Sequence, residues 1–241
     1  MPTISFNGNC FGKLFIILKE NDENFGPIVK NNIDILLQKV KNVTVFCSKS
    51  GKMTNNLVNQ WIACLTNDID FQNQLKPLKI LLLLDSYTAH WNANFDSLIN
   101  SEKCSIMRKK IPKGITSIAQ PLDTGFNHHF KYFIKKFNDR IKLDELDLNI
   151  KSRETIITVF SLAWNQMSSP KFQGMLKYCW ISSGYCNEKI SFKNVRELCF
   201  ITNSNDCNIN ECTNNFYIRC AYCNLNLCLY HFYNEYHIHE L

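Results

Sequence analysis

The chain has 241 residues, 45% of them hydrophobic, and a formal net charge of +6. This content is enough for a packed core in one or two domains, and the positive charge favours polyanionic partners. No apolar run approaches the ~20 residues of a membrane-spanning helix, and residues 1–10 lack the pattern of a secretory signal, so we expect an intracellular protein without a membrane partner. In that setting its 12 cysteines are not expected to form a disulfide framework.

The first apolar run, residues 14–18, leads into the polar segment KENDENFG, whose composition predicts a turn. Two acidic residues, Glu20 and Asp22, begin this segment and lie where a strand would end. A carboxylate in that position can bind a metal ion, but a solvated turn residue is the simpler interpretation, and we expect Glu20 and Asp22 to be turn residues.

A continuous apolar run, Ile80 to Leu84, predicts a strand buried on both faces of a sheet. Asp85 follows it directly, and His90 comes five residues later. In open α/β sheets ligands gather at the carboxyl ends of the strands, so Asp85 is a candidate site residue. The alternative is that Asp85 only starts or caps the loop.

A second aspartate, Asp123, follows Gln120-Pro121-Leu122. A proline at the first helical position and an acid in the first turn predict a helix start here. The helix has an apolar stripe and a basic outer face. Asp123 either complements the helix dipole or contributes a carboxylate to a site.

Basic residues gather in two places. Between the two aspartates lie Arg108, Lys109, Lys110 and Lys113, and on the outer face of the following helix lie Lys131, Lys135 and Lys136. Such residues either form a solvated surface or contact phosphates, which would make binding fall steeply with salt.

Two further helices are predicted before the C-terminal tail. The first covers Arg153 to Met167 on apolar spacing, and the second opens at Ser169-Pro170 as cap and first-turn proline. We expect their apolar residues to be core and assign them no chemical role. Residues 203–207, rich in Asn and Ser, predict a linker.

The tail has a different composition. Residues 206–239 hold five cysteines and three histidines in close pairs: Cys207 with Cys212, Cys220 with Cys223, Cys228 with His231, and His237 with His239. Thiolate and imidazole are preferred ligands of Zn²⁺, and a short loop lets both members of a pair reach one ion. The order of the pairs suggests two interleaved sites, in which the first and third pairs share one ion and the second and fourth share the other.

A single zinc site made of Cys220, Cys223, Cys228 and His231 is also plausible, as are a redox-active cysteine cluster and unligated burial. His237 and His239 are the pair in doubt, because a histidine-rich terminus can simply be solvated. The other cysteines are scattered among apolar neighbours and are interpreted as core residues, with Cys199 close enough to the tail to be an extra ligand.

The segments KILLLLDSYTAHW and IPKGITSIAQPLDTGF together resemble the DDE superfamily endonuclease domain of pogo, Tigger and jerky-like transposases. The resemblance extends from about Pro2 to Phe200, and its flanks match mainly by pattern. It implies an α/β, RNase H-like fold in which three carboxylates hold two Mg²⁺ ions that promote phosphodiester cleavage. Asp85 corresponds to the second of these acids and Asp123 to the third. The tail more weakly resembles Cys-rich C-terminal modules of piggyBac and pogo-like transposases.

The family's first acid lies on a strand upstream of PTISFNG, and this sequence begins at Met1 directly before that segment. We therefore expect an N-terminally truncated RNase H-like core without its first strand over residues 1–145, a helical extension over 146–202, and a zinc module over 203–241.

Two functional hypotheses follow from the absence of the family's first acid from this sequence. The chain is either a transposase-derived nuclear protein that binds DNA without cleaving it, or part of an active Mg²⁺-dependent transposase whose first acid comes from a preceding segment. In the first case the zinc module would serve contacts with DNA, with a second copy of the chain or with another nuclear protein.

Overall fold

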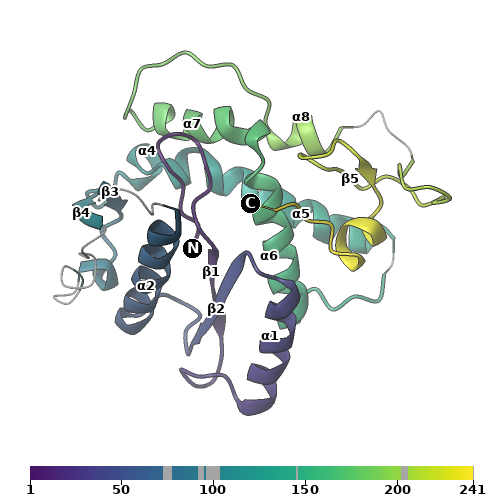
Figure 1. Cartoon of the computed structure of the whole chain (residues 1–241), viewed down its shortest axis with the longest axis horizontal. Coiled ribbons are helices and arrows are strands. Elements are labelled where there is room, and N and C mark those ends of the chain that lie inside the picture. The colour runs from purple at the N-terminus through teal and green to yellow at the C-terminus, as the bar shows by residue number, and fades with distance from the viewer. Residues whose placement is uncertain (73–77, 92–94, 96–103, 145, 202–205, 241) are drawn as a thin grey trace. The chain divides into compact units, whose positions relative to one another are not determined.

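The computed structural model describes residues 1–72, 78–91, 95, 104–144, 146–201 and 206–240 (Figure 1). The chain forms two compact units. Unit 1 contains Met1–Thr3 and Gly12–Asp123, and unit 2 contains Ile4–Phe11 and Thr124–Leu241. Within the described ranges, no helix is long and apolar enough to cross a membrane.

Unit 1 begins with a strand, a helix and a parallel strand. Strand β1 (Leu14–Lys19) pairs in parallel with β2 (Val43–Ser48), and α1 (Pro27–Lys39) makes the crossover between them. A parallel pair needs such a crossover, and Pro27 at the helix start has the backbone angle that a first turn requires. The rings of Phe15 and Phe46 stack with their centroids 4.8 Å apart, which ties the two strands together.

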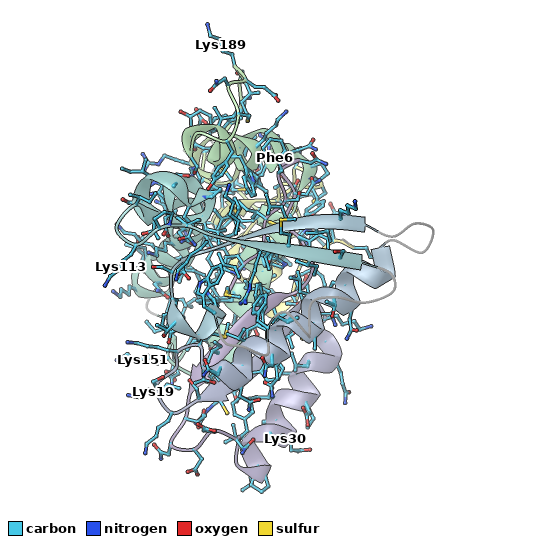
Figure 2. The ribbon with its side chains drawn as sticks, turned by 90° about the vertical axis from the view of Figure 1, so that its left-hand side faces the viewer. Phe6, Lys19, Lys30, Lys113, Lys151 and Lys189 are labelled. Carbon is cyan, nitrogen blue, oxygen red and sulfur yellow. The ribbon has the colours of Figure 1, made fainter. Side chains whose placement is uncertain are left out.

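A second parallel pair completes unit 1. The elements that follow β2 are α2 (Asn55–Gln72), β3 (Leu78–Leu84), the 3₁₀ turn η1 (Thr88–Trp91), β4 (Cys104–Lys110) and α4 (Thr116–Ala119). Strands β3 and β4 run side by side (Figure 2), in register from Leu78 opposite Cys104 to Leu84 opposite Lys110.

The expectation that this apolar strand is buried on both faces is wrong. Leu84 is buried, but Leu81 is 55% exposed, and Met107, its neighbour on β4, is 70% exposed. Helix α2 packs near β4 and η1, so in the described residues the pair is covered on one face and open on the other.

The chain is a mixed α/β protein, as predicted. Among the described residues the strands form three sheets of two strands each, β1 with β2, β3 with β4, and β5 with β6. This topology confirms the mixed class but not the predicted RNase H-like core, which needs a larger sheet.

Unit 2 is mainly helical. A π-helical turn, η2 (Leu122–Phe126), leads into α5 (Asn127–Leu143), which is followed by α6 (Arg153–Met167), η3 (Pro170–Phe172), α7 (Gln173–Ser182) and α8 (Val195–Cys199). The predicted stripe of α5 is buried at Phe133, Phe137 and Ile141. Helix α6 has the predicted bounds, and the Ser169 side chain caps η3 as expected.

The C-terminal tail belongs to the same compact unit as these helices. It contains a short antiparallel hairpin of β5 (Ile218–Arg219) and β6 (Asn226–Leu227), followed by the π-helical turn η4 (Tyr230–Asn234). Most of the predicted linker lies outside the described residues, and the predicted division at residues 145 and 202 stays a prediction.

The turn after Asp123 is packed tightly against α7. The Thr124 hydroxyl lies 3.1 Å from the Cys179 carbonyl oxygen, to which it donates, and 2.9 Å from the Ser183 hydroxyl. A Cβ atom added at Gly125 would lie 2.6 Å from the Cys179 sulfur, closer than any real contact. The backbone after Asp123 is therefore held by a contact that only glycine permits.

We predict that Gly125→Ala lowers the free energy of unfolding by about 1–3 kcal/mol, because the added methyl group overpacks this contact. Cys179→Ala in the same chain should recover part of the loss, since it removes the clashing sulfur. Gly26→Ala is the control, because nothing lies within 4 Å of its added Cβ. Denaturant unfolding measures all three, and equal losses for Gly125→Ala and Gly26→Ala would contradict the packing argument.

Candidate functional site

Asp85 lies directly after β3, where the sequence predicted it, and its side chain organises the following loop. Its Oδ1 atom accepts a hydrogen bond from the Tyr87 backbone N–H at 3.1 Å and lies 2.8 Å from Nδ1 of His90. The Trp91 indole N–H donates to the Asp85 carbonyl oxygen at 2.9 Å. Both of these side-chain bonds go to the same oxygen, Oδ1.

His90 is the buried partner in this loop. Its side chain is 8% exposed, against 34% for the Asp85 side chain. The Nε2 atom of His90 is buried and has no hydrogen-bond partner among the described residues. The hydrogen bond with Asp85 thus supplies a polar contact for an otherwise enclosed ring.

Asp123 is exposed and lies in the first turn of η2, where its backbone N–H donates to the Gln120 carbonyl oxygen at 2.9 Å. π-Helical turns are rare and are often found at functional sites. Asp123 and Asp85 belong to the same compact unit. However, the described residues contain only two groups of three or more potential metal ligands, and neither aspartate belongs to one. Glu20 and Asp22 also lie outside both groups, in the turn after β1.

The predicted basic residues have different surroundings. Arg108 is half-buried, donates to the His90 carbonyl oxygen at 2.9 Å and lies over the rings of Trp91 and Phe95, so it has a structural role. Lys110 is exposed but lies over Trp91, with its Nζ 5.0 Å from the ring centroid. The exposed side chains free of these ring contacts are Lys109, Lys113, Lys131 and Lys135, whereas Lys136 lies over Tyr132.

The tail carries its cysteines and histidines on a hairpin and the turns around it. Cys220 and Cys223 lie at the tip between β5 and β6, where the Asn224 N–H donates to the Cys220 carbonyl oxygen at 3.1 Å. Asn224 has φ +63°, and Glu211, directly before Cys212, has φ +62°. These left-handed residues turn the backbone sharply beside a cysteine, so the sulfurs of each pair point to the same place.

The first cluster consists of Cys207, Cys212, Cys228 and His231. Nδ1 of His231 lies 3.2 Å from the sulfurs of both Cys207 and Cys228, and the Cys212 and Cys228 sulfurs are 3.9 Å apart. The other ring nitrogen, Nε2, lies 3.7 Å from the Glu235 carboxylate. A carboxylate behind a histidine is the usual partner that orients a metal ligand.

The second cluster consists of Cys220, Cys223, His237 and His239. Nε2 of His239 lies 3.3 Å from the Cys220 sulfur, and Nε2 of His237 lies 3.5 Å from the Cys223 sulfur. The two Nε2 atoms are 3.1 Å apart. Tyr222 stacks on the His239 ring with centroids 4.7 Å apart, which fixes the plane of the imidazole.

Both clusters have the dimensions of a tetrahedral zinc site. Bond lengths of about 2.3 Å to sulfur and 2.05 Å to nitrogen separate two thiolates by about 3.8 Å, a thiolate and an imidazole by about 3.5 Å, and two imidazoles by about 3.3 Å. The observed separations are 3.9 Å, 3.2–3.5 Å and 3.1 Å respectively. The residues fit a metal ion, and they meet in the interleaved grouping rather than in the single-site alternative. Cys199 belongs to neither cluster.

The thiols of two cysteines are shifted toward the charged form. Burial acts to raise the pKa of Cys207, but hydrogen bonds from the backbone of Ile209 and Cys228 and from His231 lower it to about 7. Burial likewise opposes ionisation of Cys220, yet contacts with His237, the backbone of Cys223 and Gln166 lower its pKa to about 5. Thiolate is the form that binds a metal ion, so one cysteine of each cluster is prepared for ligation.

Helix α6 supports the second cluster through residues for which the sequence predicted only a place in the core. Asn165 and Gln166 are buried, at 1% and 0% exposed, and both bond to the tail. The side chain of Asn165 bonds to the backbone of His239, and that of Gln166 bonds to Ala221 and Cys220. Two adjacent amides directly after the apolar residues Leu162 to Trp164 were the available signal, because a buried amide needs partners.

Comparison with known proteins decides the family. Residues 13–175, more than half of the chain, match the DDE superfamily endonuclease model. The chain belongs to the DDE superfamily endonuclease family. Residues 180–239 of this DDE-family chain match the Tc5 transposase C-terminal domain, and this segment includes both Cys/His clusters. The match confirms that the tail resembles the C-terminal module of a transposase.

A curated relative of this DDE-family chain is CENP-B homolog protein 2 of Schizosaccharomyces pombe (strain 972 / ATCC 24843). The two are 24% identical over 139 residues, which cover 56% of this chain and 26% of the relative. The chain thus spans about a quarter of the length of this relative. No solved structure matches the chain.

We predict that Asp85→Ala lowers the free energy of unfolding by about 1–3 kcal/mol, because it leaves a buried nitrogen of His90 without its partner. Asp85→Asn keeps an acceptor oxygen for the Tyr87 N–H and should cost less. Denaturant unfolding measures both variants. A loss from Asp85→Asn as large as that from Asp85→Ala would show that this oxygen does not hold the loop.

Proposed function

We propose that this chain is a transposase-derived, DNA-binding protein of the nucleus that does not cleave DNA as the 241 residues stand. Its membership of the DDE endonuclease family carries the proposal. The CENP-B homologue among its relatives and the excess of Lys and Arg support DNA as the partner. An RNase H-like core for unit 1 is part of the proposal, because the family implies it.

Zn²⁺ is the proposed ion of both clusters. Their donor set of five thiolates and three imidazoles is the one that zinc prefers, and the separations fit tetrahedral coordination. Bound there, zinc would cross-link four segments of a tail whose two strands are only two residues long each.

We predict two zinc ions per purified chain and one in either Cys212→Ser or Cys223→Ser, since each variant breaks one cluster. Cys186→Ser, a cysteine outside both clusters, is the matched control and should keep two. Metal analysis after dialysis against a weak chelator measures the content. Zinc retained in full by both cluster variants, or absent from the unaltered chain, would refute the assignment.

The exposed lysines are the proposed DNA contacts. Lys109 and Lys113 lie near the end of β4, and Figure 2 shows Lys113 pointing away from the protein. Lys131 and Lys135 lie on the outer face of α5. Arg108, Lys110 and Lys136 are weaker candidates for phosphate contacts, since each already lies over an aromatic ring.

We predict that Lys109→Glu with Lys113→Glu weakens binding to duplex DNA and reduces the slope of log K against log salt by about 2, one unit per lost phosphate contact. Lys30→Glu with Lys41→Glu changes the net charge equally elsewhere in unit 1. Fluorescence anisotropy across a salt series measures both pairs. If the two pairs weaken binding equally, only the overall charge matters, and no contact surface exists at the end of β4.

The proposed lack of cleavage rests on the count of carboxylates. The family implies three acids around two Mg²⁺ ions, and this sequence supplies Asp85 and Asp123 for that motif. Magnesium prefers several carboxylate oxygens from separate elements, and two leave the site short of charge and of ligands. A preceding segment that supplies the third acid is the second hypothesis and would make the longer protein an active nuclease.

We predict no Mg²⁺- or Mn²⁺-dependent nicking of supercoiled plasmid by the 241-residue chain, measured by gel electrophoresis. Asp85→Ala and Asp34→Ala chains are run beside it to identify any contaminating nuclease, since Asp34 lies outside the motif. Nicking that is lost in Asp85→Ala and kept in Asp34→Ala would establish activity and overturn the proposal.

The tail also suits a protein partner, which includes a second copy of the chain. Tyr230 is 55% exposed beside a cavity of about 560 Å³ that Arg140, Asp144, Tyr233 and Cys228 also line. Tyrosine side chains are common at protein interfaces. Light scattering with and without zinc tests this second candidate, because a mass that stays monomeric in both would exclude self-association.

A further inference from the structure

We infer that an ion bound at the second cluster fixes the C-terminus against helix α6. Ion binding at that cluster is therefore thermodynamically coupled to the folding of the helical core. Asn165 and Gln166 are the positioning residues that set the affinity of this cluster for its ion. The first cluster holds its ion by contacts within the tail alone. The inference rests on the proposed zinc binding and assigns different roles to the two ions.

The first observation is an unusual line of buried polar groups. Five polar side chains of α6 and of the residues just after it are at most 4% exposed: Thr155, Ser161, Asn165, Gln166 and Ser169. A buried polar group without a partner is costly. A helix that needed only to pack against other helices would carry apolar side chains at these positions.

The second observation is that all five bond to the tail. Tyr233 donates to Thr155, the Tyr236 hydroxyl lies 2.6 Å from that of Ser161, and Ser169 donates to the Ala221 carbonyl oxygen at 3.0 Å. Figure 1 shows the C-terminal segment beside α6. This face of α6 is therefore complete only when the tail is folded onto it.

Asn165 holds the last ligand of the second cluster by its backbone. Its Nδ2 donates to the His239 carbonyl oxygen at 2.7 Å, and its Oδ1 accepts from the His239 N–H at 3.1 Å. Two bonds from one amide fix both the position and the direction of that peptide. The imidazole of His239 is thereby aimed at Cys220 and His237.

Gln166 contacts a ligand atom directly. Its Nε2 donates to the Cys220 sulfur at 3.5 Å, and its Oε1 accepts from the Ala221 N–H at 2.7 Å. An N–H donor beside a thiolate stabilises its charge, and partners of this kind typically change metal affinity by about 10–100-fold. The side chain of one helical residue thus connects the helix core to the second ion.

In the first cluster, the hydrogen-bond partners of the proposed ligands come from the tail and not from α6. Asn214 donates to the Cys228 sulfur at 3.8 Å, and Glu235 lies behind His231. Both partners are tail residues. Of the bonds between tail and α6 described above, only that of Tyr233 reaches the turn that carries His231, and Tyr233 is not a ligand.

The test uses the 241-residue chain with one cluster disrupted at a time. Cys212→Ser leaves only the second cluster intact, and Cys223→Ser leaves only the first. Gln166→Glu keeps the acceptor for Ala221 and loses the donor to the Cys220 sulfur. Asn214→Asp is the matched change at the first cluster, because it removes the donor to the Cys228 sulfur.

Competition with a chromophoric chelator gives the Zn²⁺ dissociation constant. We expect Gln166→Glu to raise it about 10–100-fold in the Cys212→Ser background and to leave it unchanged in the Cys223→Ser background. Asn214→Asp should show the reverse pattern. An equal effect of Gln166→Glu in both backgrounds, or none in either, would overturn the inference.

Hydrogen exchange of α6 gives a second readout that does not depend on Gln166. Protection over Arg153–Met167 should fall in Cys223→Ser and stay near that of the unaltered chain in Cys212→Ser. Equal protection in the two chains would overturn the inference, even if Gln166→Glu did not fold. Failure of the unaltered chain to bind zinc would instead refute the proposed function.

Discussion

The fold of the tail depends on four pairs of cysteine and histidine residues that meet in two clusters. Its two strands are only two residues long each, too short to hold a hairpin by backbone bonds alone. The left-handed turns at Glu211 and Asn224 place the cysteines, and the interleaved order makes each cluster join segments far apart in the tail. Tyr217, Leu227 and Phe232 then have a fixed framework to pack within.

Helix α6 connects the fold of the tail to the helical part of unit 2. The buried amides and hydroxyls of α6 find their hydrogen-bond partners in the tail, and the tail packs on α6. The helices and the tail therefore form one compact unit. The match to a Tc5 transposase C-terminal domain begins at residue 180, after α6, so the supporting helix lies in the segment that matches the DDE endonuclease model. The part of the DDE-matched segment from Thr124 onward therefore shares one compact unit with the Tc5-matched segment.

Regular spacing and ligand pairs were predictable from the sequence, because each depends on neighbouring residues. The bounds of α6, the stripe of α5 and the interleaved pairs are of this kind. The exposure of Leu81 was not predictable, since an apolar run is the same whether a sheet has two strands or five. The roles of Asn165 and Gln166 were missed because their partners lie more than 50 residues away.

For the two aspartates, too, the sequence predicted the local position but not the tertiary contacts. The position of Asp85 after a strand follows from local pattern, and the structure adds that His90 occupies one of its oxygens. The setting of Asp123 in a π-helical turn, followed by Gly125 packed on Cys179, depends on α7 and could not be inferred locally.

X-ray absorption at the zinc edge tests the central claim most directly, because it counts the ligand atoms around each ion. The two clusters share five sulfur and three nitrogen ligands, so the spectrum should give an average of 2.5 sulfur and 1.5 nitrogen atoms per ion, at two ions per chain. Three sulfurs and one nitrogen around a single ion, or a shell dominated by oxygen, would contradict the account.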